Sequence, residues 1–99
     1  MNIRKTQNEN TLVIELEGRL DTATAPELEK EIKSSLDGIT KLVFDFAKLD
    51  YITSAGLRVL LFAQKTMMTK GTMVVKNANE MIMEVFDVTG FNDILTIEN

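Results

Sequence analysis

The chain lacks cysteine and histidine altogether, and proline occurs only once among its 99 residues, at Pro26. Without cysteine it can form neither disulfides nor thiolate metal sites, and the cytoplasm is its default compartment. Without histidine it cannot build a Ser-His-Asp triad, a histidine general base or a histidine-bearing zinc site from its own residues. No serine of this chain can therefore be activated by an imidazole of the same molecule.

Long apolar runs and an excess of basic residues are missing as well. No run approaches the roughly 20 residues that a membrane-spanning helix requires, and the first residues lack the pattern of a signal peptide. Lysine and arginine total 11 against 15 acidic residues, which gives a net charge of -4 and argues against nucleic-acid binding. The length and an apolar content of 44% fit one globular domain over residues 1–99.

Alternating apolar residues predict strands in this chain, and apolar residues at helical spacing predict helices. Strands are predicted at 3–7, 11–17, 41–46, 72–76 and 95–97. Helices are predicted from Thr24 to about Asp37, from Ser54 to about Gly71, and from Asn77 to about Gly90. Thr24 and Asn77 each precede a glutamate by three residues, the spacing of a helix N-terminal cap. The second helix is expected to have one apolar face with Leu57, Leu60, Leu61, Gln64 and Met68.

The predicted order of elements is β-β-α-β-α-β-α-β, which is an α/β fold. Strand-helix-strand connections are right-handed crossovers, so the second, third and fourth strands run parallel. Their carboxyl ends share one edge of the sheet, where open α/β sheets usually bind ligands. Loops 18–26, 47–53 and 77–79 are expected to meet at this edge. The residues expected to become neighbours there are Asp21, Thr22, Asp50, Thr53, Ser54 and Asn77.

The stretch LDYITSAGLRVLL, from Leu49 to Leu61, places two hydroxyls where the second helix is predicted to begin. Ser54 has two interpretations there. It is either an N-cap, whose oxygen accepts a backbone N–H and adds about 1 kcal/mol, or a phosphate acceptor at the positive end of the helix dipole. Thr53 could serve as the cap instead. Gly56 is expected to leave room for another backbone or for a phosphate.

Three other patterns suggest competing kinds of site. Asp21, Asp45 and Asp50 could hold magnesium, but Asp45 lies within a predicted strand and has no acidic neighbour. The turn around Ser54 resembles a nucleophile elbow, but Ile52 stands where that motif needs glycine. Several methionines could form a groove for a partner helix, although core packing explains them more simply. We therefore expect no metal, no cofactor and no catalytic residue.

The stretches GRLDTATAPELE (18–29) and LVFDFAKLDYITSAGLRVLL (42–61) together resemble the STAS family, specifically its single-domain anti-sigma-factor antagonists. The resemblance covers essentially the whole chain and follows the family's order of elements. It implies a mixed sheet of four to five strands with the helices packed on one side. It also implies a binding module that is not an enzyme and that a protein kinase, the anti-sigma factor, phosphorylates on a serine.

In such a partner switch the dephosphorylated antagonist binds the anti-sigma factor and frees sigma, and a PP2C-type phosphatase resets the switch. The family's acceptor serine falls on Ser54, and Asp21 matches the aspartate of the first loop. The sequence leaves the oligomeric state and the identity of the partners open. The residues expected to contact the partner are Asp21, Thr22, Asp50, Thr53, Ser54, Gly56, Leu57 and Arg58.

Two positions depart from the pattern of many relatives. Thr53 stands where they carry an aspartate, and Ala55 stands where they carry a second serine. The loss of the acidic neighbour makes the surroundings of Ser54 less negative and leaves Thr53 as a competing acceptor. Two other functions stay open: a non-phosphorylated STAS subunit of a lipid-transport ATPase or stress-signalling complex, and a small-ligand or nucleotide-binding module using the same edge.

Overall fold

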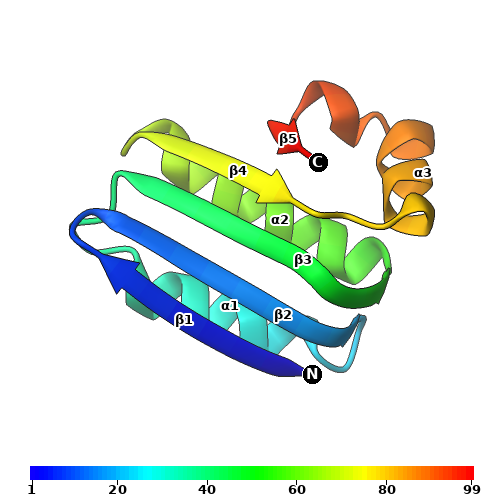
Figure 1. Ribbon diagram of the computed structural model, residues 1–99, viewed down its shortest axis with the longest axis horizontal. Coiled ribbons are helices and arrows are strands. Elements are labelled where there is room, and N and C mark those ends of the chain that lie inside the picture. The colour runs from blue at the N-terminus through cyan, green and yellow to red at the C-terminus, as the bar shows by residue number, and fades with distance from the viewer.

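The computed structural model describes residues 1–99 as one mixed five-stranded sheet and three α-helices (Figure 1). The strands lie side by side in chain order; β1 is antiparallel to β2, and all other neighbours are parallel. The predicted α/β order is confirmed, with one additional 3-10 turn, η1. The elements are β1 (Asn2–Asn8), β2 (Thr11–Leu20), α1 (Ala25–Ser35), β3 (Lys41–Ile52), α2 (Ser54–Met68), β4 (Thr72–Lys76), α3 (Glu80–Thr89), η1 (Phe91–Asp93) and β5 (Ile97–Glu98).

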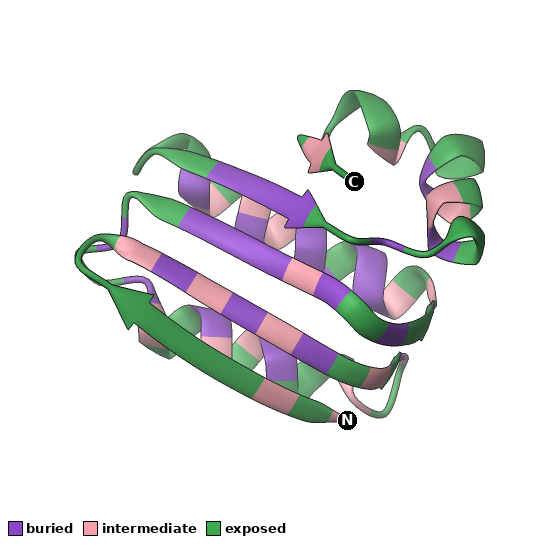
Figure 2. Cartoon of the chain, viewed as in Figure 1, coloured by how far each residue is buried: buried purple, intermediate pink, exposed green.

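Helices α1 and α2 cover the same face of the sheet, and α3 lies beyond the carboxyl end of β4 (Figure 1). Along β2, Leu12, Ile14 and Leu16 are buried, whereas the residues between them are half-buried on the opposite face. Figure 2 shows this alternation as stripes along β2. The period of two is what a strand needs to bury one side against helices. The expectation that the helices pack on one side of the sheet is confirmed for α1 and α2.

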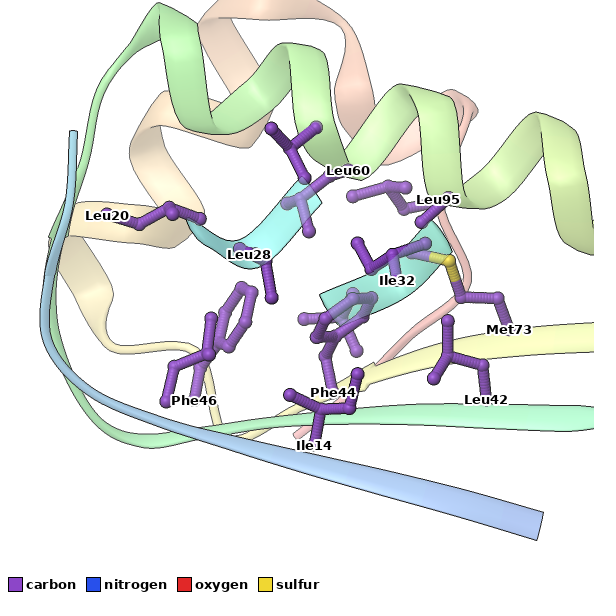
Figure 3. Close-up of a cluster of buried hydrophobic side chains, with 14 of the residues drawn as sticks. Ile14, Leu20, Leu28, Ile32, Leu42, Phe44, Phe46, Leu60, Met73 and Leu95 are labelled. Atoms are coloured by element: carbon purple, nitrogen blue, oxygen red, sulfur yellow. The ribbon is translucent and has the colours of Figure 1, made fainter. Parts of the chain in front are cut away.

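The core lies between the sheet and these two helices (Figure 3). The rings of Phe44 and Phe46, on β3, lie 5.9 Å apart between centroids, and Leu28 and Ile32 of α1 and Leu60 of α2 pack over the sheet. All five side chains are fully buried. Burying a side chain of this size stabilises the fold by roughly 1.5–3 kcal/mol. The core therefore fixes α2, and with it the residues at the start of α2, in one place above the sheet.

β3 is longer than the sequence predicts. A strand ending at Phe46 and a loop over 47–53 were expected, but β3 continues to Ile52. The prediction is wrong because the buried residues at this end, Phe46, Leu49 and Ile52, are spaced by three rather than by two. A strand with this spacing does not show the strict alternation of apolar and polar residues by which strands are predicted.

Two irregularities in the pairing of β3 with β2 explain that spacing. The register slips between Glu15 and Glu17, and again between Gly18 and Arg19 of β2. At each slip β3 contributes one extra residue, which is the definition of a β-bulge, and bulges bend and twist a strand. β2 likewise continues to Leu20, so the loop expected over 18–26 is shorter than predicted.

The apolar face of α2 differs from the prediction, because Val59 and Ala63 are buried whereas Leu61 and Gln64 are only half-buried. Met67 is fully buried, whereas Met68, which was assigned to that face, is 73% exposed. Met67 lies two helical turns after Leu60 and one turn after Ala63, both of which are fully buried, so Met67 is on the same face of the helix as they are.

None of the helices is both long and apolar enough to cross a membrane.

Neither of the two side-chain caps that the sequence predicts is formed. Thr24 occupies the N-cap position of α1, but its hydroxyl donates to the carbonyl oxygen of Arg19 at 2.8 Å instead. α3 is capped by Asn79 rather than by Asn77, since the Asn79 Oδ1 accepts the backbone N–H of Ile82 at 2.8 Å. A glutamate three residues on is thus a weaker signal here than the position immediately before the helix.

The last strand is shorter and later than the predicted strand at 95–97. It consists of Ile97–Glu98 and pairs with the end of β4. The 3-10 turn Phe91–Asp93 follows Gly90, whose positive φ of 79° ends α3. This turn directs Leu95 into the core, where it is 6% exposed, so Leu95 is a core residue and not part of the strand.

Candidate functional site

The start of α2 presents an exposed serine. Thr53 has extended backbone angles and occupies the N-cap position, and its carbonyl oxygen accepts the first helical hydrogen bond from Leu57 at 3.0 Å. Ser54 is the first residue of the helix, and its side chain is exposed. The interpretation of Ser54 as the N-cap is therefore wrong. The backbone N–H groups of this first turn have no partner within the helix, and the Thr53 side chain does not bond to them.

The two neighbouring hydroxyls are in opposite environments. The Oγ1 atom of Thr53 is enclosed by the protein and has no hydrogen-bond partner. The Thr53 backbone N–H donates to the carbonyl oxygen of Leu20 at 3.0 Å, which holds the start of α2 against the end of β2. Only the hydroxyl of Ser54 is open to a reagent or an enzyme.

Thr53→Val is expected to stabilise the protein. A buried polar atom without a partner costs about 1–3 kcal/mol, and valine has the shape of threonine without the hydroxyl. We expect the free energy of unfolding, measured by urea denaturation, to rise by roughly 1 kcal/mol. Thr22→Val, at an exposed threonine of the neighbouring loop, is the matched control and is expected to change it by less than about 0.5 kcal/mol. A loss of stability in Thr53→Val would mean that this hydroxyl has a partner in solution.

The loop after β2 is organised by Asp21. Its Oδ1 atom accepts the backbone N–H groups of Ala23 at 3.0 Å and Thr24 at 3.1 Å, and the Asp21 N–H donates to the Thr24 hydroxyl at 2.9 Å. The pKa of the Asp21 carboxyl lies below its ordinary value of 3.8, and the main cause is the hydrogen bond from the Thr24 backbone N–H. Asp21 is therefore ionised at neutral pH. Asp21 directly follows Leu20, whose carbonyl oxygen accepts the N–H of Thr53, so the Asp21 loop leaves β2 at the point where the start of α2 is bonded.

Asp50 belongs to the bulged end of β3 and has an exposed side chain. Its backbone is held from the outside by Asn79, whose Nδ2 atom donates to the carbonyl oxygens of Leu49 and Asp50, both at 3.2 Å. Asn79 thus ties the bulge to the first turn of α3, which it also caps. Asn79 is not among the residues that the sequence predicts. The signal that could have found it is an asparagine placed directly before the apolar residues of a predicted helix.

A groove between α1 and α2 opens beside Ser54. Arg58, one helical turn after Ser54, and Thr22, in the Asp21 loop, both contribute to its walls. Arg58 is exposed and forms no ion pair. The lining residues are Thr22, Ala25, Pro26, Glu29, Ala55, Arg58, Val59 and Phe62. The structure therefore brings Thr22 and Arg58 to one groove, and Ala55, the residue after Ser54, lines it as well.

Gly56 and Leu57 lie inside the protein rather than on this surface. A Cβ atom at Gly56 would stand 2.7 Å from Cγ of Leu20 and 2.8 Å from Cγ1 of Ile52. The expected room for a phosphate at Gly56 is therefore wrong, because core side chains occupy it. The missing side chain instead allows α2 to approach the ends of β2 and β3. Gly56 and Leu57 position Ser54 from below.

Asn77 does not join the start of α2 by any hydrogen bond. Its Nδ2 atom donates to Oδ1 of Asp45 at 3.0 Å, and the same oxygen accepts the backbone N–H of Ala47 at 3.0 Å. Asn77 has a positive φ of 62° and leads the chain from β4 towards α3. Asp45 and Asn77 thus stabilise the first bulge of β3. No three acidic side chains lie close enough together to hold a metal ion.

These observations define a small α/β protein with one accessible serine hydroxyl at the carboxyl edge of its sheet. The chain belongs to the STAS domain family, which matches residues 2–99. Family membership agrees with the resemblance carried by residues 18–29 and 42–61.

The curated relatives that match this chain are named as anti-sigma factor antagonists. BtrV of Bordetella bronchiseptica, named as an anti-sigma factor antagonist, is 38% identical over 90 residues, which cover 89% of this chain and 78% of BtrV. The anti-sigma-B factor antagonist of Bacillus subtilis is 28% identical over 98 residues, covering 98% of this chain and 90% of that protein. Anti-sigma factor antagonists are in general not enzymes, and their name implies an anti-sigma factor as partner.

Solved structures confirm the fold. An anti-sigma factor antagonist from Mycobacterium paratuberculosis superposes with a TM-score of 0.88 at 21% identity, over 97% of this chain and 83% of that one. The unphosphorylated form of the anti-sigma factor antagonist SpoIIAA superposes with a TM-score of 0.78 at 19% identity, over 99% and 88% of the two chains. The phosphorylated form of SpoIIAA from Bacillus superposes with a TM-score of 0.77, also at 19% identity, over 99% and 92%.

Proposed function

We propose that this protein is an anti-sigma-factor antagonist of a bacterial partner switch. It acts as a single, non-enzymatic STAS domain in the cytoplasm and binds an anti-sigma factor that has serine kinase activity. Binding releases the sigma factor, and phosphorylation of Ser54 by the same anti-sigma factor ends the interaction. A PP2C-type phosphatase restores the binding form. The relatives that carry this name support the proposal.

One observation carries the proposal: the side chain of Ser54 is exposed at the first residue of α2, and the neighbouring Thr53 hydroxyl is enclosed. A kinase must bring the γ-phosphate of ATP to the acceptor oxygen, so an enclosed hydroxyl is a poor substrate. Thr53 thereby loses the role of competing acceptor that the sequence leaves open. An exposed serine with no capping role also favours a phosphorylated switch over a non-phosphorylated structural subunit.

The helix start accommodates a phosphate without disturbing the fold. A phosphate on Ser54 adds about -1.5 to -2 charges, but it lies at the positive end of the α2 dipole and beside N–H groups that have no helical partner. Arg58 is exposed one turn further along and forms no ion pair, so it is available as a counter-charge. The modified protein is therefore expected to keep its structure and to change mainly in what it binds.

We propose that the partner contacts the exposed surface around Ser54. The residues proposed to make this contact are Asp21, Thr22, Asp50, Ser54 and Arg58, of which Thr22 and Arg58 line the groove between α1 and α2. Gly56, Leu57 and the enclosed part of Thr53 support this surface from the core side. Asp21 is ionised and follows Leu20, which is bonded to Thr53, so a phosphate on Ser54 adds negative charge to a surface that is already negative and that the partner must desolvate. This is the physical basis of the proposed switch.

Incubation with the cognate kinase and ATP is expected to place one phosphate on Ser54 and none on Thr53. Mass spectrometry of the digested protein locates the phosphate. Thr53→Val is the control that should be phosphorylated like the wild type, whereas Ser54→Ala should not be phosphorylated at all. Modification on Thr53, or at any residue outside this loop, would contradict the assignment.

A further inference from the structure

The net charge of the protein is concentrated in its last quarter. Residues 1–76 carry 11 basic and 10 acidic side chains, whereas residues 77–99 carry five acidic side chains and no basic one. The whole negative balance of the molecule therefore belongs to α3, η1 and β5. Figure 1 shows that these elements lie together at one end of the sheet. Three of the five exposed large hydrophobic side chains, Met81, Val88 and Ile94, are in the same segment.

On α3 these two kinds of side chain form parallel stripes. Ile82 and Phe86 are buried and define the inner side of the helix. On the outer side Met81 is 54% exposed and Val88, two turns later, is 75% exposed, so the two lie in one row along the helix. The adjacent row is acidic and consists of Glu80, Glu84 and Asp87. We name these five residues the α3 face.

The stability of the helix explains only Glu80 of the acidic row, because a negative charge in the first turn is favourable to the helix dipole. Glu80 and Glu84 are separated by four residues, a spacing at which like charges destabilise a helix. Asp87 lies in the last turn, where a negative charge opposes the helix dipole and where no basic residue offsets it. None of the three carboxylates takes part in an ion pair. A contact outside the chain would supply both the missing positive charges and the cover for Met81 and Val88.

We infer that the α3 face is a docking surface for a basic amphipathic segment of a protein partner. Such a segment covers Met81 and Val88 with apolar side chains and pairs lysines or arginines with the acidic row. The contact goes beyond the proposed function, because it involves neither Ser54 nor the loops around it. Charge complementarity selects this occupant. A second copy of this chain would bring acidic row against acidic row, and a nucleic acid or an anionic membrane would be repelled.

The test uses the full-length, isotope-labelled protein and a synthetic amphipathic peptide of leucine and lysine, followed by heteronuclear NMR. The expected result is a saturable shift of amide signals confined to residues 80–89 and their immediate contacts. A peptide of the same pattern with glutamate in place of lysine should produce no shift. Higher salt should weaken the binding, since exposed charges are screened.

Matched variants test whether the apolar residues of the α3 face bind the peptide. Met81→Ser combined with Val88→Ser should weaken the peptide at least roughly ten-fold, because two apolar side chains lose their burial in the complex. Met68→Ser removes an apolar side chain that is 73% exposed at the end of α2 and should leave the affinity unchanged. Thermal unfolding should confirm that the double variant is folded. Absence of binding, shifts scattered over the molecule, or equal effects of the two sets of substitutions would overturn the proposal, and none of these results depends on Ser54 phosphorylation.

Discussion

Ser54→Asp is expected to bind the anti-sigma factor roughly ten-fold more weakly than the wild type, a loss of about 1.4 kcal/mol. The aspartate places one negative charge at the first residue of α2, and the ionised Asp21 follows Leu20, which is bonded to Thr53. The partner must then desolvate two negative charges, where in the wild type it meets one charge and a neutral hydroxyl. The effect is smaller than that of a phosphate, because aspartate has one charge and less bulk. Surface plasmon resonance with the immobilised anti-sigma factor measures the affinities.

Two control variants separate the effect of the charge at position 54 from the effects of net charge and of losing the hydroxyl. Ser34→Asp makes the same change at an exposed serine near the end of α1 and should leave the affinity unchanged. Ser54→Ala removes the hydroxyl without adding charge and should bind with nearly wild-type affinity, while resisting inactivation by the kinase. An equal loss of affinity in Ser34→Asp and Ser54→Asp would reduce the effect to net charge alone.

Gly56→Ala is expected to lower the free energy of unfolding by about 1–3 kcal/mol, although alanine favours a helix over glycine by about 1 kcal/mol. The added methyl would stand 2.7 Å from Cγ of Leu20 and 2.8 Å from Cγ1 of Ile52, closer than these atoms can tolerate. α2 must then move away from the ends of β2 and β3. Since Ser54 lies two residues earlier, the substitution should also weaken partner binding without touching the contact surface. Urea denaturation and the same affinity measurement test both effects.

A double-mutant cycle identifies the cause. If the clash with Leu20 is responsible, the cost of Gly56→Ala should shrink in a Leu20→Ala background, where the space is vacant. Leu20→Ala alone is expected to cost about 2–5 kcal/mol because it leaves a cavity. A Gly56→Ala protein more stable than the wild type would mean that α2 does not approach the sheet as closely as described.

The order of elements could be predicted from the sequence because most elements carry their own local signal. β2 alternates strictly between Thr11 and Leu16, and α1 repeats Leu28 and Ile32 at helical spacing. The rule that crossovers are right-handed then gives the parallel direction of the central strands. The start of α2 at Ser54 could also be located from a local signal, because small residues there separate two apolar runs.

The carboxyl end of β3 could not be predicted, because its bulges are set by the pairing with β2 and not by its own residues. Phe46, Leu49 and Ile52 are buried at a spacing of three, which resembles neither a strand nor a complete helix face. Asn79 was missed for a related reason: its bonds to Leu49 and Asp50 join residues some thirty positions apart in the chain. Such contacts exist only once the sheet has formed.

In the candidate site, too, some features could be predicted from the sequence and others depend on contacts between distant segments. Topology assigned Asp21, Thr22 and Ser54, among others, to one edge, whereas Arg58 was expected only as a partner contact. In the structure the end of β2 is bonded to Thr53, and Thr22 and Arg58 line one groove beside the start of α2. The burial of Gly56 and of the Thr53 hydroxyl depends on side chains of β2 and β3 that pack beneath the helix. A linear motif contains no information on which of its small residues faces the core.

The most direct test of the central claim compares the affinity of the anti-sigma factor for the unmodified protein and for the protein phosphorylated on Ser54. Isothermal titration calorimetry gives both values under the same conditions. We predict that the phosphate costs on the order of 2–5 kcal/mol, which is a loss of roughly thirty-fold or more. Equal affinities for the two forms would contradict the account, because Ser54 would then carry a modification that does not control binding.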